Sequence, residues 1–319
     1  MTQAERRRRR LVPAITVVVL VLVALVAVRC GVPSGGRATC SDGSAAPSGR
    51  WCPVYAENFS TPAALGSFTN EPVGDWYLQG GHPYAGSLRS YPDGWGTTED
   101  FSLNYASRTT DVVERAKGAR GVLRLHGHTG EVDGRPQALG GSFYPVIDPL
   151  AKEKQQQVAQ TYGRYTVRFT TTGGYRKTAT GQYPDISDEP GYGTAFLLWP
   201  ANDRWAEGEI DYPEMTWGAP VAGAVHTIGN PEVNADTFQT TTSTQGDWHT
   251  ATIEWSPGLL VFLLDGAEVR RLTTDVPSTP FRWGFQSGGT LGTPAPDLAG
   301  YLYVDEISID AYVADGDEG

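Results

Sequence analysis

The sequence lacks the signals that mark several common enzyme classes. It has no Gly-x-Ser-x-Gly motif, no P-loop and no dinucleotide-binding fingerprint, which excludes the usual serine hydrolases, NTPases and dehydrogenases. It also lacks a long stretch of helical periodicity and an internal repeat. Charged residues make up only 19%, while 39 glycines, 22 prolines and 11% aromatic residues are typical of a β-rich protein with many loops.

Cysteine is also scarce, with three residues in 319. Cys40 and Cys52 flank a short polar segment, and in an oxidising compartment we expect them to form a disulfide at the start of the domain. Two unpaired thiols are the alternative. Cys30 has no predicted partner, and removal, lipidation or burial at a membrane boundary are all open for it.

Positive charge is concentrated at the N-terminus. The net charge is −11, and residues 1–29 contribute +5, so the remainder carries −16. Such an acidic body argues against a nucleic-acid partner and is compatible with a neutral polymer.

The first 30 residues predict export. Five arginines at positions 6–10 precede a predominantly apolar run of 18 residues at positions 11–28. A basic segment followed by an apolar one is typical of a secretory signal, and this length also reaches the lower limit for a membrane span. We therefore expect an extracellular or cell-surface protein, a monomer, with either a cleaved signal or an N-terminal membrane anchor.

The rest of the chain predicts one all-β domain. Residues 31–52, rich in Gly, Ser and Pro, are expected to form a linker, residues 53–312 the folded domain, and residues 313–319 an acidic tail. Strand-like runs alternate with turn signals, most clearly at 121–126, 162–169, 250–255, 259–264 and 301–309. Asp265-Gly266 predicts a hairpin. Many short strands without helices between them indicate a sandwich or jelly roll.

Residues 205–215 contain three carboxylates, Glu209, Asp211 and Glu214, in a β-prone run. Alternate strand residues share a face, and one extra residue at Pro213 would return Glu214 to the side of the other two. Like charges on one sheet face cost stability, but they suit an enzyme that needs one ionised and one protonated carboxyl group. A solvated acidic strand edge is the alternative.

This motif, with Trp199-Pro200 upstream and Gly208 before the first Glu, resembles the Glu-x-Asp-x-x-Glu signature of glycoside hydrolase family 16, in the bulged form of laminarinase-like members. Other segments are similar to that family as well: Gly163-Arg164-Tyr165, Trp248-His249, Glu254-Trp255, Asp265-Gly266 and Val304-Asp305. The resemblance implies a concanavalin-like β-jelly-roll sandwich of two antiparallel sheets, with a substrate cleft across the concave sheet.

The resemblance also implies residue roles. Glu209 is expected to be the nucleophile of a retaining glycosidase and Glu214 the general acid and then base, with Asp211 between them. His226, in a segment resembling the neighbouring strand, is expected to reach the carboxylates or the sugar. A core histidine bonded to the backbone is the alternative, and Thr227 replaces the aromatic residue usual in the family.

Trp199, Trp205 and Trp217 bracket the motif and are candidates for stacking on sugar rings, although a buried core position is the alternative for each. Trp95 and Tyr192 are expected to line the cleft from loop insertions. Catalysis needs no cofactor in this family. The resemblance does imply a structural Ca²⁺ on the convex side, held by Glu57, the Gly121 carbonyl and Asp305. His126 and His128 have metal-like spacing, but a surface pair is favoured because no third ligand is evident.

The substrate class stays open within these limits. An endo-acting β-glucanase on β-1,3 or mixed β-1,3/1,4 linkages is the main hypothesis, with a polysaccharide as the partner. A non-catalytic surface glycan-binding protein is the alternative from another class. A transglycosylase or a galactan hydrolase would use the same motif.

Overall fold

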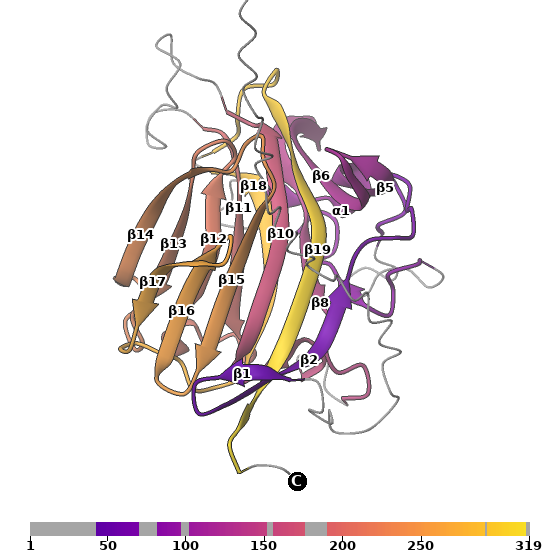
Figure 1. Ribbon diagram of the computed structural model, residues 1–319. Helices are drawn as coiled ribbons and strands as arrows, with labels where there is room; N and C mark the ends of the chain where they lie inside the picture. Colours follow the sequence, from indigo (N-terminus) through magenta and orange to yellow (C-terminus); the bar gives the residue numbers. More distant parts are fainter. Residues whose placement is uncertain are drawn as a thin grey trace, which may run out of the picture. The chain divides into compact units, whose positions relative to one another are not determined.

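Two β-sheets form the fold of the computed structural model, which describes residues 43–69, 82–96, 102–151, 156–175, 190–290 and 292–316. In Figure 1 the larger sheet, with β10 and β19 near its middle, lies in front of the smaller sheet. The larger sheet has the order β17 (Ala267–Leu272), β16 (Leu259–Leu264), β15 (His249–Ser256), β10 (Gly163–Gly173), β19 (Ala299–Ala314), β6 (Ala119–Val132), β7 (Arg135–Gly140) and β4 (Ser102–Asn104). Beside this path lie β1 (Ser44–Ala46), β2 (Gly49–Glu57) and β5 (Thr110–Ala116).

The smaller sheet carries the acidic motif. Its order is β14 (Asn234–Ser243), β13 (Pro220–His226), β12 (Ile210–Thr216), β11 (Tyr192–Pro200), β18 (Phe281–Gly289), β8 (Ser142–Pro145) and β3 (Leu88–Arg89), with β9 (Ala159–Gln160) beside β18. The helical elements described are short: α1 (Ala106–Thr109), η1 (Gln156–Val158) and η2 (Trp205–Glu207). Described strand pairs are antiparallel except for β4 with β7. The predicted all-β jelly-roll class is thereby confirmed.

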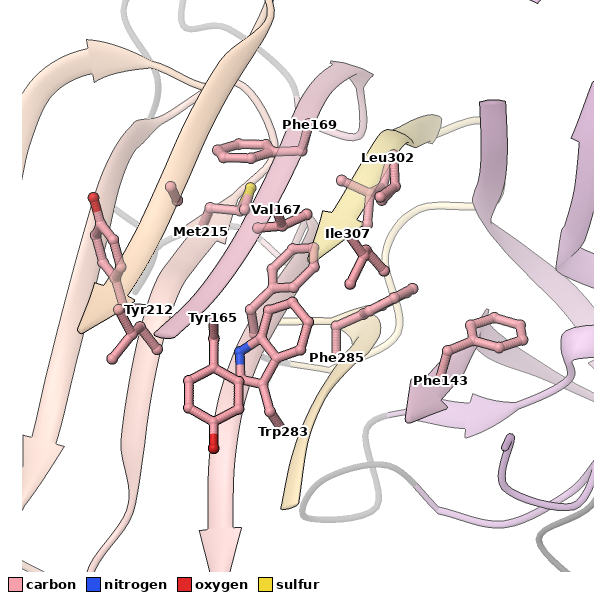
Figure 2. Close-up of a cluster of buried hydrophobic side chains, with 14 of the residues drawn as sticks. Phe143, Tyr165, Val167, Phe169, Tyr212, Met215, Trp283, Phe285, Leu302 and Ile307 are labelled. Carbon is pink, nitrogen blue, oxygen red and sulfur yellow. The ribbon is translucent and has the colours of Figure 1, made fainter. Parts of the chain in front are cut away.

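The core lies between the inner faces of the two sheets. Figure 2 shows part of it, with Trp283 and Phe285 from the smaller sheet and Val167 and Phe169 from the larger one. The Phe285 ring centroid is 4.9 Å from that of Phe196. Each such buried side chain stabilises the fold by about 1.5–3 kcal/mol through removal of apolar surface from water. Inward residues alternate with outward ones along each strand, so the other face of the smaller sheet is free to carry polar groups.

The strands expected from the sequence are confirmed. Residues 259–264 coincide with β16, and the other four segments lie wholly or largely within β6, β10, β15 and β19. Asp265 and Gly266 join β16 to β17 with φ angles of 51° and 80°. Positive φ at both central residues is what a type I′ hairpin turn requires, which explains the Asp-Gly pair.

Two expected boundaries were wrong. The linker was placed at residues 31–52, but β1 and β2 begin at Ser44 and Gly49. The tail was placed at 313–319, but β19 continues to Ala314. Both errors have one cause: β2 pairs with β19 from Gly49 opposite Ala314 to Glu57 opposite Ile307. These long-range backbone hydrogen bonds bring a Gly- and Ser-rich segment into the sheet.

The predicted signal or anchor, Cys30 and Cys40 lie outside the described residues. The pairing of Cys40 with the buried Cys52 therefore stays a prediction, and so does export. Within the described part of the chain, no helix is long and apolar enough to cross a membrane.

Replacing Phe285 by Ala should lower the free energy of unfolding by about 3–5 kcal/mol, because the cavity left between the sheets cannot refill. Urea denaturation of the purified protein measures this change. Leu65→Ala is the control, since Leu65 is 59% exposed and its loss should change stability by less than about 0.5 kcal/mol. Equal effects of the two substitutions would contradict the assignment of the core.

Candidate active site

A one-residue bulge interrupts β12. Glu214 and Asp211, three positions apart, lie opposite Ala195 and Leu197 of β11, which are two positions apart. The β13 side shows the same mismatch, with Ala222 opposite Glu214 and Ala224 opposite Asp211. The extra residue lies at positions 212–213, where the peptide bond before Pro213 is cis. The bulge expected from the sequence is confirmed.

The bulge places the three carboxylates on one face. Before it, Ile210 and Tyr212 point into the core, and after it the inward position shifts to Met215. Asp211 and Glu214 therefore share the face turned away from the core, and Glu209 precedes them on that side. Asp211 is only 5% exposed, which excludes a solvated acidic strand edge.

Glu209 is held by a tryptophan just upstream. The Trp205 indole Nε1 donates a hydrogen bond of 2.7 Å to Glu209 Oε2. Trp205 lies in η2, and Gly208 reverses the chain after it with φ of 101°, a conformation that favours glycine. This tight turn explains how an indole four residues before Glu209 reaches its carboxylate.

His226, at the end of β13, bridges the carboxylates and a loop carbonyl. Its Nε2 lies 3.3 Å from Asp211 Oδ2 and 3.8 Å from Glu209 Oε2. Its Nδ1 lies 2.7 Å from the Pro231 carbonyl oxygen, which can only accept, so Nδ1 carries a proton. Hydrogen bonding to Asp211 raises the pKa of His226 to about 9, against the opposing effect of burial. A protonated His226 ring can donate from Nδ1 to the Pro231 carbonyl and from Nε2 to Asp211 at the same time.

Burial raises the pKa of all three carboxyl groups. For Glu209, the nearby His226 charge and the Trp205 hydrogen bond oppose this rise. For Asp211, burial and the neighbouring Glu209 charge hold the pKa well above its usual range. The Glu214 residue is exposed, yet desolvation by the protein around its carboxyl group raises its pKa, and His226 opposes the rise. Glu209 therefore has the better-stabilised anion, and Glu214 is suited to hold a proton.

Two predicted aromatic residues lie beside the site. The Trp199 and Trp205 rings are stacked with centroids 6.4 Å apart, and Trp205 also contacts the His226 ring at 5.6 Å. Trp199 Nε1 donates to Asp203 Oδ1 at 3.0 Å. Both indoles are half-buried, so each retains surface for a sugar ring.

Two other aromatic predictions were wrong. Trp217 and Tyr192 are fully buried in the core and cannot stack on a substrate. Trp217 donates to Thr194 Oγ1 at 2.9 Å, and the Tyr192 hydroxyl contacts Thr129 at 3.0 Å. The bulge explains the burial of Trp217. After Pro213 it shifts the inward-facing positions from even-numbered to odd-numbered residues. Tyr192 shares the inward parity of Phe196 on β11.

Gln286 and Ala195 were not expected at the site, and they lie in register with Glu214 on the outer face of the smaller sheet. Alternation on β18 could have identified Gln286, because Trp283 and Phe285 point into the core. The predicted Trp95 is 42% exposed, and its ring lies 5.8 Å from that of Tyr91.

Two of the donors expected for Ca²⁺ already have partners in the protein. Asp305 is paired with Arg168, whose guanidinium lies 4.7 Å from the Trp248 ring centre. Glu57 Oε1 accepts the backbone N–H groups of Asn58 and Phe59 at 3.0 and 2.9 Å. A guanidinium thus already neutralises Asp305, and no catalytic step is assigned to a metal there.

Elsewhere in the described residues, Glu209, Asp211 and His226 place ligand-type atoms within 4.8 Å of one another. Because both His226 nitrogens face hydrogen-bond acceptors, this cluster fits proton sharing better than metal binding. His126 and His128 stack on each other at 4.5 Å, as a pair.

The stabilising effect of His226 should depend on pH. Its folded pKa of about 9 lies above the ordinary 6.5, so its contribution is complete below pH 6.5 and is lost as the pH rises through 9. The difference in free energy of unfolding between the wild type and His226→Gln should therefore be larger at about pH 6 than at about pH 9.5. Denaturant titrations at both pH values measure it, and a pH-independent difference would refute the charged state.

Comparisons with known proteins agree with this geometry. Residues 155–285 match the model of glycosyl hydrolases family 16, a stretch that includes the three carboxylates and His226. No curated protein sequence matches the chain significantly.

Solved β-glucanases share the fold. An endo-β-1,3-glucanase from Pyrococcus furiosus has a TM-score of 0.55 and 16% identity, covering 83% of this chain and 96% of that chain. The catalytic domain of a laminarinase from Thermotoga petrophila has a TM-score of 0.54 and 16% identity, and the match covers 84% of this chain and 100% of that one. A prokaryotic lichenase from a mouse hindgut metagenome has a TM-score of 0.53 and 16% identity, and the match covers 81% of this chain and 99% of that one.

Identities this low show a common fold, while the family match covers the segment that carries the chemistry. The resemblance expected from the sequence is thus supported: residues 155–285, which carry the bulged carboxylate strand, match the model of glycosyl hydrolases family 16.

Proposed function

We propose that the protein is an exported, retaining endo-β-glycosidase that cleaves a β-1,3- or mixed β-1,3/1,4-glucan. The observation that carries the proposal is the set of three carboxylates on one face of β12, inside the matched family segment. The β-glucanases that share the fold support a β-glucan as substrate. Export rests on the basic and apolar residues of positions 1–28.

In the first step, the Glu209 carboxylate attacks the anomeric carbon while Glu214 gives its proton to the glycosidic oxygen. The indole of Trp205 and the His226 cation favour the ionised form of Glu209. The raised pKa of Glu214 favours its protonated form. The two glutamates thus begin in the protonation states that double displacement requires.

In the second step, the Glu214 carboxylate takes a proton from water, and the resulting hydroxide releases the sugar from Glu209. The covalent bond to Glu209 breaks, and the anomeric configuration of the substrate is restored. Asp211, buried between Glu209 and His226, orients both side chains.

The outer faces of neighbouring strands support binding of an extended chain. Ala222 and Ala224 of β13 lie beside the carboxylates, and Thr237 and Gln239 of β14 continue the same rows. Small side chains beside the catalytic strand leave room for a polymer that crosses several strands, as internal cleavage requires.

Substitution should separate the two glutamate roles. Glu209→Ala should reduce hydrolysis of both a polymer and an activated aryl glycoside by at least about 10⁴-fold, because no covalent intermediate forms. Glu214→Ala should reduce polymer cleavage by about 10²–10⁴-fold but affect the first step on the aryl glycoside far less, since a good leaving group needs no acid. Initial rates and burst kinetics measure these effects. Equal losses on both substrates for both variants would contradict the assignment.

The substrate class and stereochemistry can be tested together. The wild-type domain should release reducing ends from laminarin or mixed-linkage β-glucan, and proton NMR should show the β-anomer forming first. Agarose is the control polymer, and Glu209→Gln is the control protein. An α-anomer as the first product would refute the retaining mechanism, and cleavage of agarose alone would refute the glucan assignment.

A further inference from the structure

The outer face of the smaller sheet is covered at its β8 end. Tyr144 of β8 lies across Gly284 of β18, where a Cβ atom would come within 2.4 Å of the tyrosine ring. Gly284 points outward, because Trp283 and Phe285 on either side point into the core. Tyr144 is fully buried, so an aromatic ring replaces the open floor at this position.

Two more aromatic residues continue outward from Tyr144. The Tyr91 ring lies 5.3 Å from Tyr144, and the two hydroxyl groups are 2.8 Å apart. Gln286 Nε2 donates to the Tyr144 hydroxyl at 2.9 Å. The Trp95 ring lies 5.8 Å from Tyr91 at an interplanar angle of 31°. We call Tyr91, Trp95 and Tyr144 the end wall.

Trp95 is exposed, and hydrogen bonds to Asn104 hold the backbone around it. Asn104 Nδ2 donates to the Tyr91 carbonyl at 2.6 Å, and Asn104 exchanges two backbone hydrogen bonds of 2.7 Å with Gly94 and Trp95. A single exposed apolar residue needs no explanation. Here, however, the exposed ring ends a cluster of tilted aromatic rings that is joined to the face carrying the carboxylates. A rigid aromatic ring loses little entropy on binding.

The end wall lies close to the catalytic strand. Glu214, Ala195 and Gln286 are direct neighbours on β12, β11 and β18. With neighbouring strands about 4.8 Å apart, Gln286 lies about 10 Å from Glu214 across the sheet. A chain that crosses the sheet in this direction therefore meets the end wall after only a few sugar rings.

We propose that Trp95, supported by Tyr91 and Tyr144, is a terminal sugar-stacking platform that closes the β8 end of the cleft. This inference rests on the proposed function and adds a specificity-determining residue to it. The end wall limits how many sugar units bind on that side of the cleavage point. Long oligosaccharides therefore depend on Trp95, whereas those too short to reach it do not.

The test measures binding without turnover, by calorimetry in the Glu209→Gln background. The probes are β-1,3-gluco-oligosaccharides of two and six units. Trp95→Ala should weaken binding of the six-unit chain by about three- to tenfold, as expected for loss of one aromatic stacking contact, and leave the two-unit chain unchanged. Trp95→Phe should recover most of the affinity. Trp248→Ala is the matched control, because Trp248 lies against Arg168 of the larger sheet.

Unchanged six-unit binding in Trp95→Ala, or an equal loss for both lengths, overturns the platform. Reducing-end release by the wild-type enzyme is measured in parallel. If the wild type cleaves β-glucan and Trp95→Ala binds normally, only the platform is overturned. If the wild type neither cleaves nor binds any β-glucan, the proposed function is overturned, and the platform with it.

Discussion

The site depends on one extra residue in β12. Without the bulge between Asp211 and Glu214, strict alternation would turn Glu214 into the core, where an unpaired carboxylate costs several kcal/mol. With it, Ile210, Tyr212 and Met215 still fill the core, while the carboxylates share the outer face. The paired strands β11 and β13 hold the bulge in place from both sides, so the geometry belongs to the sheet rather than to the segment.

The electrostatic arrangement follows from this placement. Burial raises the pKa of all three acidic groups, and the charges of neighbouring carboxylates add to the rise for Glu209 and Asp211. His226 offsets part of this rise, and the Pro231 carbonyl fixes which nitrogen faces the carboxylates. The Trp205 indole contacts only one of the glutamates, so chemically identical side chains acquire different proton affinities. The proposed roles of nucleophile and acid require such a difference.

The outer faces of the two sheets carry different side chains. The larger sheet holds outer charges in local pairs, such as Asp305 with Arg168. The smaller sheet has small residues at Ala222 and Ala224 on one side of the catalytic strand and the end wall on the other. This asymmetry distinguishes the two ends of the outer face of the smaller sheet, although both are built on the same alternating strands.

The sequence by itself determined the all-β class, the main strands, the Asp265-Gly266 hairpin and the carboxylate motif, because period-2 alternation, turn chemistry and a dense acidic motif are local signals. It also led to His226 through resemblance. Only the tertiary structure decided that residues 44–52 join the domain, that Trp217 and Tyr192 are buried, and that Asp305 pairs with Arg168. The pairings of residues 44–52 and of Asp305 depend on partners more than 100 residues away, and the burial of Trp217 depends on the parity shift at the bulge, which no local pattern records. Tyr192 follows the alternation of β11, whose inward face became known only from the structure. The end wall also depends on the tertiary structure, because Tyr91, Tyr144 and Gln286 meet only when β18 pairs with β8.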